Sequence, residues 1–398
     1  MTGPAVTGPF ALGAALADRK QAGLLRNRIA TDGASGGRLR VAGREYINFS
    51  ANDYLGLADH PAIKAAFNAG IERYGAGSGA SPLVTGYSRA HQQLEETLAE
   101  WLGLEAVLLF NCGFSANQAV LKALLGKEHL LWQDKLNHAS LQEMGSQLPC
   151  KMKRFGHNDM AALERQLEPN RGLIVSEGVF SMDGDQGPWH ELATLAARSG
   201  NWLMIDDAHG LGVLGPEGRG TLAAQGVNPA SVHIQMGTFG KALGVAGAFV
   251  GGSRELVEYL VNFARHYVYS THMPAAQACA VSKSIELVRG ADEARAHLAR
   301  LIARFRQGAQ ALGWTLGASD TPIQPLLVGE SSAALQLAER LRDRGVWVSA
   351  IRPPTVPVGT ARLRITLSAA HREQDVDRLL EALGPCSGSA NLEGIHHG

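Results

Sequence analysis

The sequence predicts an α/β protein, with a mainly parallel seven-stranded sheet in a large domain and a small α+β domain at the C-terminal end. Seven short apolar runs, none longer than six residues, alternate with helical stretches. After about residue 285 this rhythm changes to a long helix followed by short strands. Glycine makes up 47 of 398 residues without a repeating period, which indicates many close backbone approaches.

Length and composition exclude several classes of protein. A chain of 398 residues is long enough for two or three domains with a large core. Hydrophobic residues at 45% and charged residues at 19% exclude a chain that is disordered throughout. The 37 basic residues balance the 37 acidic ones without a long block of either sign, so we expect neither nucleic acid nor a membrane as a partner.

Cysteine usage and the N-terminal segment predict a cytoplasmic protein. The four cysteines are widely spaced, with no Cys-x-x-Cys pair and no zinc-type spacing to histidine, which indicates a reduced compartment and no metal site. Residues 1–17 lack the basic start of a signal peptide, and prolines interrupt them. No apolar run reaches the roughly 18 residues that a membrane span needs.

Residues 1–59 are predicted to form an N-terminal arm with a helix and a hairpin. Leu12, Leu16, Leu24 and Leu25 mark the amphipathic helix. Residues 38–49 follow as a short hairpin that turns at Gly43.

Residues 60–285 are predicted to form the large domain. Helical stretches such as 61–74 and 88–101 separate the apolar runs. Strands alternating with helices build a mainly parallel sheet that is covered on both faces. The seven predicted strands are residues 106–110, 129–132, 151–155, 173–176, 202–205, 232–236 and 246–251.

Residues 286–385 are predicted to form the small C-terminal domain. A long helix over 292–312 is followed by short strands, a helix over 333–344, a turn at Pro353-Pro354 and a strand over 362–367. The polar tail, 386–398, is predicted to be disordered.

The residues after the predicted strands are the candidates for a site, because ligands of such sheets bind beyond the carboxyl ends of the strands. They include Gly113 and Phe114 after the first strand, His138 after the second and Ser181 after the fourth. Asp206-Asp207-Ala208-His209 ends the fifth strand, and Thr238-Phe239-Gly240-Lys241 ends the sixth.

Lys241 and Asp206 could together hold a pyridine cofactor. Only nine of the 37 basic residues are lysine, and a desolvated lysine amine becomes a nucleophile for carbonyl groups. A buried Asp206 could keep a pyridinium nitrogen protonated, which makes the ring an electron sink. The alternative for Lys241 is a surface lysine on a glycine turn. Asp206 and His209 could instead be a buried pair that hydrogen-bond to each other, or two ligands of a metal ion. His138 offers a flat face for stacking, or is a structural histidine.

Gly113-Phe114 opens a helix over 115–125 and could place free backbone N–H groups against an anion. Thr238, and Thr271 further along the chain, could add hydroxyl donors to a phosphate. An ordinary strand-to-helix turn is the alternative for Gly113 taken singly.

Several motifs together resemble the α-oxoamine synthases, pyridoxal-phosphate enzymes of the aspartate-aminotransferase fold (fold type I), over roughly residues 12–384. Residues 350–357, Ala-Ile-Arg-Pro-Pro-Thr-Val-Pro, resemble the member of the family that uses alanine, whereas sister synthases carry other residues there. The matching segments are residues 52–57, 75–79, 86–91, 177–184, 207–210 and 361–364.

The resemblance implies a site for pyridoxal 5'-phosphate. Lys241 would form the Schiff base and move the Cα proton, and Asp206 would pair with the pyridinium nitrogen. His138 would stack on the ring and also contact the substrate. The remaining cofactor contacts would be Ser181 and His209 near the phenolic oxygen, with Gly113, Phe114 and Thr238 at the ring and phosphate.

The resemblance also implies substrate contacts. Arg364 and Asn52 would bind the carboxylate of the amino acid, for which a guanidinium fork has matching geometry. Arg26, Arg352 and Thr355 would contact the acyl substrate. For Arg26, a solvated helix face is the alternative, since Arg19 and Arg28 lie nearby.

The activity implied by the resemblance is a decarboxylating condensation of L-alanine with pimeloyl-CoA or pimeloyl-acyl carrier protein in biotin biosynthesis. The family resemblance implies a homodimer with active sites at the interface, where residues 77–79 and Thr271 would approach the neighbouring cofactor. Two alternatives are a sister synthase that uses glycine or serine with another acyl thioester, and a non-catalytic scaffold of the same fold.

Overall fold

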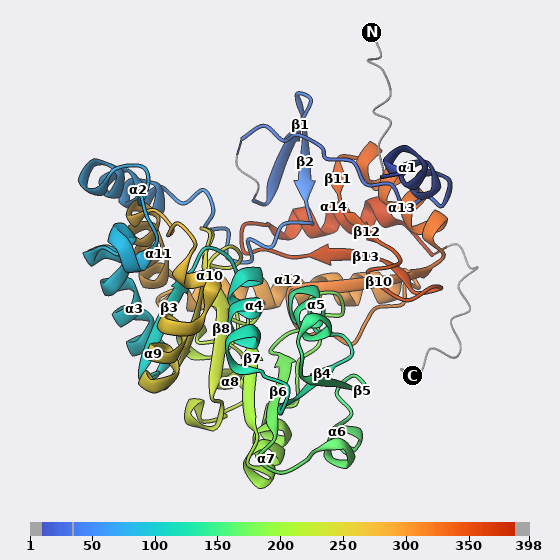
Figure 1. The fold of residues 1–398 in the computed structure, drawn as a ribbon. Coiled ribbons are helices and arrows are strands. Elements are labelled where there is room, and N and C mark those ends of the chain that lie inside the picture. The colour runs from blue at the N-terminus through green and yellow to red at the C-terminus, as the bar shows by residue number, and fades with distance from the viewer. Residues whose placement is uncertain (1–9, 34–35, 387–398) are drawn as a thin grey trace.

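Seven strands form the main sheet of the computed structural model, in which residues 10–33 and 36–386 are described. Their order across the sheet is β3-β9-β8-β7-β6-β4-β5 (Figure 1). Strands β5, β4, β6, β7 and β8 pair in parallel, and β9 lies antiparallel between β8 and β3. The predicted, mainly parallel sheet is therefore confirmed. The strands are β3 (Ala106–Phe110), β4 (Leu130–Asp134), β5 (Lys151–Phe155), β6 (Gly172–Glu177), β7 (Trp202–Asp206), β8 (Ile234–Thr238) and β9 (Ala248–Gly252).

Helices cover both faces of this sheet because its strands are apolar on both sides. Leu108 and Phe110 pack into a cluster with α4, α5, α9 and α10, whereas Val107 and Leu109 pack on the opposite face with α2, α3 and α11. Helices α6, α7 and α8 cover the rest of that second face. The bounds are α2 (Pro61–Tyr74), α3 (Arg89–Leu102), α4 (Gly113–Leu124), α5 (Ala139–Gln147), α6 (Met160–Gln166), α7 (Trp189–Ser199), α8 (Thr221–Ala224), α9 (Arg254–Phe263), α10 (Arg265–Val268) and α11 (Ala275–Arg289).

The C-terminal elements lie above the main sheet in the view of Figure 1, in orange and red. They form an antiparallel sheet in the order β10-β13-β12, on which α12, α13 and α14 pack. Among the described residues, no helix is both long and apolar enough to cross a membrane. The bounds are α12 (Asp292–Ala311), β10 (Ile323–Gly329), α13 (Ser331–Asp343), β11 (Val346–Trp347), β12 (Ser349–Ile351), β13 (Ala361–Thr366) and α14 (Glu373–Leu383).

The N-terminal hairpin joins the C-terminal part of the chain. Strands β1 (Arg38–Val41) and β2 (Arg44–Asn48) pair around Gly43, whose φ of 78° suits glycine, as the sequence predicted. Strand β2 also pairs in parallel with β11, so the N-terminal hairpin and a strand of the C-terminal part share a three-stranded sheet. The predicted disordered tail lies outside the described residues from 387 onward.

The predicted first helix needs a correction. Helix α1 (Leu12–Gln21) ends before Leu24 and Leu25, because Gly23 adopts a φ of 67° and turns the chain out of the helix. Leu12 and Leu16 are 68% and 56% exposed. The leucines at the start of the chain therefore do not form one buried stripe against the described residues.

Candidate active site

A cavity of about 170 Å³ lies beyond the carboxyl ends of β6, β7 and β8. The parallel pairing brings these strand ends to one edge of the sheet, where the residues that follow each strand meet. Most of the lining residues are polar or titratable. They are Gly113, Phe114, Asn117, His138, Glu177, Asp206, Ala208, His209, Met236, Thr238 and Lys241.

Asp206, the last residue of β7, is a buried carboxylate held by two donors. Asn117 donates from Nδ2 to Oδ2 at 2.7 Å, and the backbone N–H of Ala208 donates to Oδ1 at 3.1 Å. The same Asn117 amide group also donates to Ser140 Oγ at 2.9 Å. These bonds hold the carboxyl group at the cavity wall, where it can stabilise a positive charge on a ligand.

Lys241 reaches the cavity from the loop after β8. Burial lowers the pKa of Lys241 to about 8, against the raising effect of the Asp206 and Glu177 carboxyl groups. A larger fraction of this amine is therefore neutral near physiological pH than in an exposed lysine. A neutral amine beside a carboxylate is suited to attack a carbonyl group and to carry a proton.

The two histidines of the cavity are held in place by their neighbours. His138 caps α5, since its Nδ1 accepts from the backbone N–H of Ser140 at 3.2 Å. The Phe114 ring stands edge-on to it, at 6.2 Å between centroids and 80° between planes. Burial lowers the pKa of His138, which Asp206 raises and Lys241 lowers further.

His209 lies deeper, and its Nδ1 is 2.7 Å from the hydroxyl of Tyr54. Burial, and then the positive charges of Lys241 and Arg364, lower the pKa of His209 well below its ordinary value. The imidazole is therefore neutral, and it serves as a hydrogen-bonding group beside the cavity and not as a charge.

The residues present fit pyridoxal phosphate. The cavity combines an amine nucleophile, a buried carboxylate for a protonated ring nitrogen and a flat imidazole. Gly113 begins α4, so free backbone N–H groups and the positive end of the helix face the cavity rim, where a phosphate can bind. Two buried oxygens, Asn117 Oδ1 and Glu177 Oε1, find no hydrogen-bond partner among the described residues, which favours a polar ligand here.

The predicted carboxylate contacts lie together next to the cavity. Arg364, on β13, donates from Nη1 to Asn52 Oδ1 at 3.1 Å and from Nε to the carbonyl of Ser181 at 2.6 Å. The Tyr54 hydroxyl lies 3.2 Å from Asn52 Oδ1 and links this group to His209. Asn52, Ser181 and Arg364 do not line the cavity itself, but one chain of contacts connects them to it.

The predicted acyl contacts form a separate group at the surface. Arg26 donates to Thr355 Oγ1 at 3.4 Å, and Arg352 donates to the carbonyl of Gly23. These three side chains thus lie where the N-terminal arm meets the 352–357 segment. None of the three lines the cavity.

Residues 77–79 lie next to the segment that contains Thr271 and His272. Ser78 donates to the carbonyl of His272 at 2.6 Å, and Asn111 donates to the carbonyl of Thr271 at 2.8 Å. Thr271 does not line the cavity within this chain.

Three polar residues at the site, Asn117, Tyr54 and Glu177, were not predicted as site residues. Asn117 lies four residues after Gly113 and therefore on the same face of α4, which is the signal that could have identified it. Tyr54 lies inside the 52–57 motif, but its contact with His209 depends on residues 155 positions apart.

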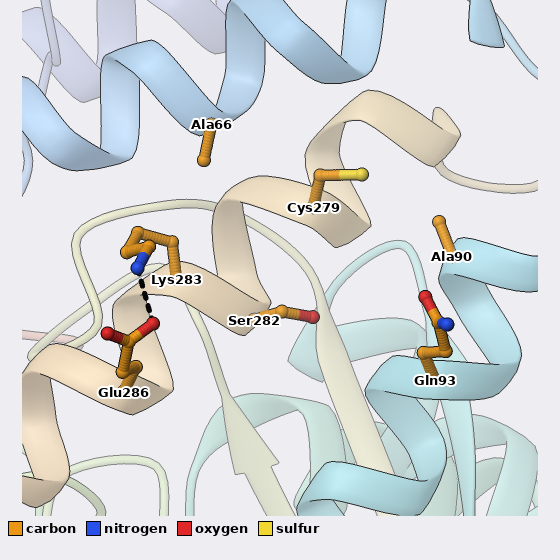
Figure 2. A pocket seen from close by; sticks show the side chains of 7 residues that line it. All are labelled: Ala66, Ala90, Gln93, Cys279, Ser282, Lys283 and Glu286. Atoms are coloured by element: carbon orange, nitrogen blue, oxygen red, sulfur yellow. Dashed lines mark hydrogen bonds and ion pairs between the residues drawn. The ribbon is translucent and has the colours of Figure 1, made fainter. Parts of the chain in front are cut away.

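A second, larger hollow of about 300 Å³ lies among α2, α3 and α11. Figure 2 shows the side chains that line it. Its charged groups, Lys283 and Glu286, pair with each other and do not converge on a ligand. Of these two cavities, the smaller one is therefore the one in which titratable side chains converge.

Comparison with known proteins agrees with this geometry. Residues 44–383 match the family model described as aminotransferase class I and II. The chain is 89% identical over 398 residues to 8-amino-7-oxononanoate synthase of Aeromonas salmonicida (strain A449), with 100% of both chains covered. It is 54% identical over 373 residues to the enzyme of the same name from Cronobacter sakazakii (strain ATCC BAA-894), covering 93% of this chain and 97% of the relative.

Solved structures show the same fold. A structure described as SPT with its PLP internal aldimine matches with a TM-score of 0.88 at 27% identity, over 94% of this chain and 95% of that chain. The crystal structure of 8-amino-7-oxononanoate synthase from Francisella tularensis matches with a TM-score of 0.76 at 28% identity, over 85% and 96%. The chain therefore belongs to the class I and II aminotransferase family, whose cofactor is pyridoxal phosphate, and within it to the 8-amino-7-oxononanoate synthases.

Proposed function

We propose that this chain condenses L-alanine with a pimeloyl thioester, with loss of CO₂, to give 8-amino-7-oxononanoate and a free thiol in biotin biosynthesis. The observation that carries the proposal is one cavity in which Lys241, with a pKa lowered to about 8, lies with Asp206 and His138. The family and its relatives support this activity.

The cofactor would be held by residues from several strand ends. Lys241 would be the attachment point, Asp206 would pair with the ring nitrogen, and His138 would stack on the ring. The other contacts would be Ser181 and His209 at the phenolic oxygen, with Gly113, Phe114 and Thr238 at the phosphate end. When bound, pyridoxal phosphate supplies an electron sink for negative charge at the alanine Cα.

The residues of the chain then position the amino acid and move one proton. Arg364 and Asn52 bind the alanine carboxylate, which places Cα near Lys241. The Lys241 amine accepts the Cα proton, and Cα forms a bond to the thioester carbonyl carbon. The C–S bond breaks, and the thiolate leaves and takes up a proton from water. The bond to the carboxylate then breaks to release CO₂, and Lys241 returns the proton that it holds to Cα.

The acyl substrate would enter past the N-terminal arm. Arg26, Arg352 and Thr355 provide two guanidinium groups and a hydroxyl there, and we propose that they contact the pimeloyl thioester. The contact of Arg26 with Thr355 supports a shared site. Whether the thiol is CoA or an acyl carrier protein is an outcome of the test below.

The assembly is proposed to be a cytoplasmic homodimer with active sites at the interface, where residues 77–79 and Thr271 face the neighbouring cofactor. The bond from Ser78 to the carbonyl of His272 supports one surface made of both segments. The four cysteines are unpaired, which suits the cytoplasm. The division into an arm (1–59), a large domain (60–285) and a small domain (286–385) also stays a proposal.

The test is thiol release by purified protein loaded with pyridoxal phosphate. Pimeloyl-CoA with L-alanine is compared with pimeloyl-acyl carrier protein and L-alanine, and with acetyl-CoA or palmitoyl-CoA and glycine or serine. Release with a pimeloyl donor and alanine is expected. Release only with another pair would move the chain to a sister synthase, and a loaded enzyme that releases no thiol in any mixture would indicate a non-catalytic scaffold.

A further inference from the structure

Glu177 is a buried carboxyl group of the cavity to which the mechanism above gives no part. It is the last residue of β6 and is only 2% exposed. The register of the sheet pairs Glu177 with Asp206, so two buried carboxyl groups end neighbouring strands. Glu177 lines the cavity, and its Oε1 has no hydrogen-bond partner among the described residues.

A second negative charge at this place would be unfavourable. A buried carboxylate oxygen without a hydrogen-bond donor loses its hydration, and no hydrogen bond replaces it. The negative charge of Asp206 would also repel a negative charge on Glu177. Burial first, and then Asp206 and Asp134, raise the pKa of Glu177 well above its usual range, while Lys241 and the backbone N–H of His138 lower it. The neutral form carries a hydrogen that can be donated into the cavity.

The strand order identifies which part of the cofactor Glu177 faces. Asp206, on β7, lies between β8, which ends at Thr238, and β6, which ends at Glu177. Asp206 is the proposed partner of the ring nitrogen. If Thr238 and Gly113 hold the phosphate, Glu177 lies on the side of Asp206 that is away from the phosphate. In pyridoxal phosphate the ring edge opposite the phosphate arm bears a methyl group next to the ring nitrogen and, beyond it, the phenolic oxygen. The phenolic oxygen is the one hydrogen-bond acceptor on that edge.

We propose that Glu177 is a further cofactor-contacting residue, whose neutral carboxyl group donates a hydrogen bond to the phenolic oxygen of bound pyridoxal phosphate. Asp206 then remains the single carboxylate at the ring nitrogen. The inference rests on the cofactor of the proposed function.

The test is a pH titration of the visible absorbance of the cofactor bound to Lys241, without acyl substrate. A donor to the phenolic oxygen stabilises its negative charge and so releases the Schiff-base proton at lower pH. Glu177→Met and Glu177→Ala remove the donor, and the midpoint should rise by about one pH unit, a tenfold change. Glu177→Gln keeps a neutral donor, so its midpoint should stay within about 0.3 pH units of the parent.

Ser176→Ala is the matched control. Ser176 is equally buried and is the neighbouring residue of β6, but its side chain points to the other face of the sheet. Its replacement should leave the midpoint unchanged.

Two results would overturn the inference. An unchanged midpoint in Glu177→Met or Glu177→Ala would exclude the hydrogen bond. A midpoint of Glu177→Gln about one unit below the parent would mean that Glu177 is ionised, and this result would overturn the inference even where the other two variants fail to fold. A parent protein that forms no visible band would contradict the proposed function instead, so the two failures are distinguishable.

Discussion

Lys241 owes its chemistry to its surroundings. Burial lowers its pKa to about 8, while the carboxyl groups of Asp206 and Glu177 limit the shift. The neutral amine is the reactive form, so cofactor-free enzyme should take up pyridoxal phosphate faster as the pH rises, with a midpoint near 8. Stopped-flow absorbance measures this rate. A rate that keeps rising toward about pH 10.5, as for an exposed lysine, would contradict the assignment.

Lys241→Ala should abolish the visible absorbance and lower turnover at least about a hundredfold, since both the attachment point and the proton carrier are removed. Lys283→Ala is the control, because Lys283 lies in the larger hollow of Figure 2 and pairs with Glu286. Its absorbance spectrum and turnover should match the parent. Retention of the visible band in Lys241→Ala would refute the role of this lysine.

His371 should make folding sensitive to acid. Its Nε2 lies 3.0 Å from the carbonyl of Asn48, its Nδ1 accepts from the N–H of Ser368 at 3.1 Å, and its ring stacks on Phe49. Burial lowers the pKa of His371 to about 4. In the unfolded chain His371 is protonated below about pH 6.5, whereas in the folded chain it stays neutral down to about pH 4. Between these two values the unfolded chain binds more protons than the folded chain, so the free energy of unfolding decreases as the pH falls.

The expected loss from His371 is about 3 kcal/mol over this pH window. Urea unfolding at several pH values from 7 to 4 would measure it. His371→Gln cannot titrate, so its free energy of unfolding should fall less steeply with acid than that of the parent, while other acid-sensitive groups affect both proteins alike. Equal slopes would show that His371 is not the titrating group.

Helices α2 and α11 approach closely because of a glycine. A Cβ added at Gly70 would lie 2.6 Å from Ala276 Cα, a backbone atom that cannot easily move. Gly70→Ala should therefore lower the free energy of unfolding by about 1–3 kcal/mol. Gly13→Ala, in the exposed helix α1, meets nothing within 4 Å and should be neutral or slightly stabilising. Denaturant unfolding measures the free energy of unfolding of both variants. Equal values for Gly70→Ala and Gly13→Ala would contradict the prediction.

Most elements of the main sheet could be predicted because each is a local apolar run. Strands β3 and β5 and helix α2 have the predicted bounds, while β8 begins two residues later than expected, at Ile234. The pairing of β2 with β11 could not be predicted, because it joins residues about 300 positions apart. Helix α1 ends early because a single glycine outweighs the apolar spacing around it.

The site is built from residues of both the seven-stranded sheet and the C-terminal sheet β10-β13-β12. Arg364 on β13 reaches Ser181 beyond β6, and Arg362 on the same strand pairs with Asp183. Pyridoxal phosphate would bind the folded chain and not the unfolded chain, so it would raise the free energy of unfolding. Pyridoxal phosphate at about 100 times its Kd should raise the free energy of unfolding by about 2.7 kcal/mol.

Differential scanning fluorimetry with and without pyridoxal phosphate measures that effect. The melting temperature of the parent should rise with cofactor concentration, whereas Lys241→Ala, which cannot form the covalent attachment, should shift less at the same concentration. A parent protein with no shift would contradict cofactor binding.

The local pattern of the sequence was sufficient to predict the alternation of strands and helices, the parallel sheet and the strand-end residues Lys241, Asp206 and His138. These features depend on the periodicity of apolar residues and on the rule that strand ends converge. The contacts of Asn117 with Asp206 and of Tyr54 with His209 emerged in the folded chain alone. The family resemblance had already grouped Arg364 with Asn52, and the folded chain adds their direct contact. These contacts join residues far apart in the chain, and no local pattern encodes such distances, since side-chain packing and the burial of charge set them.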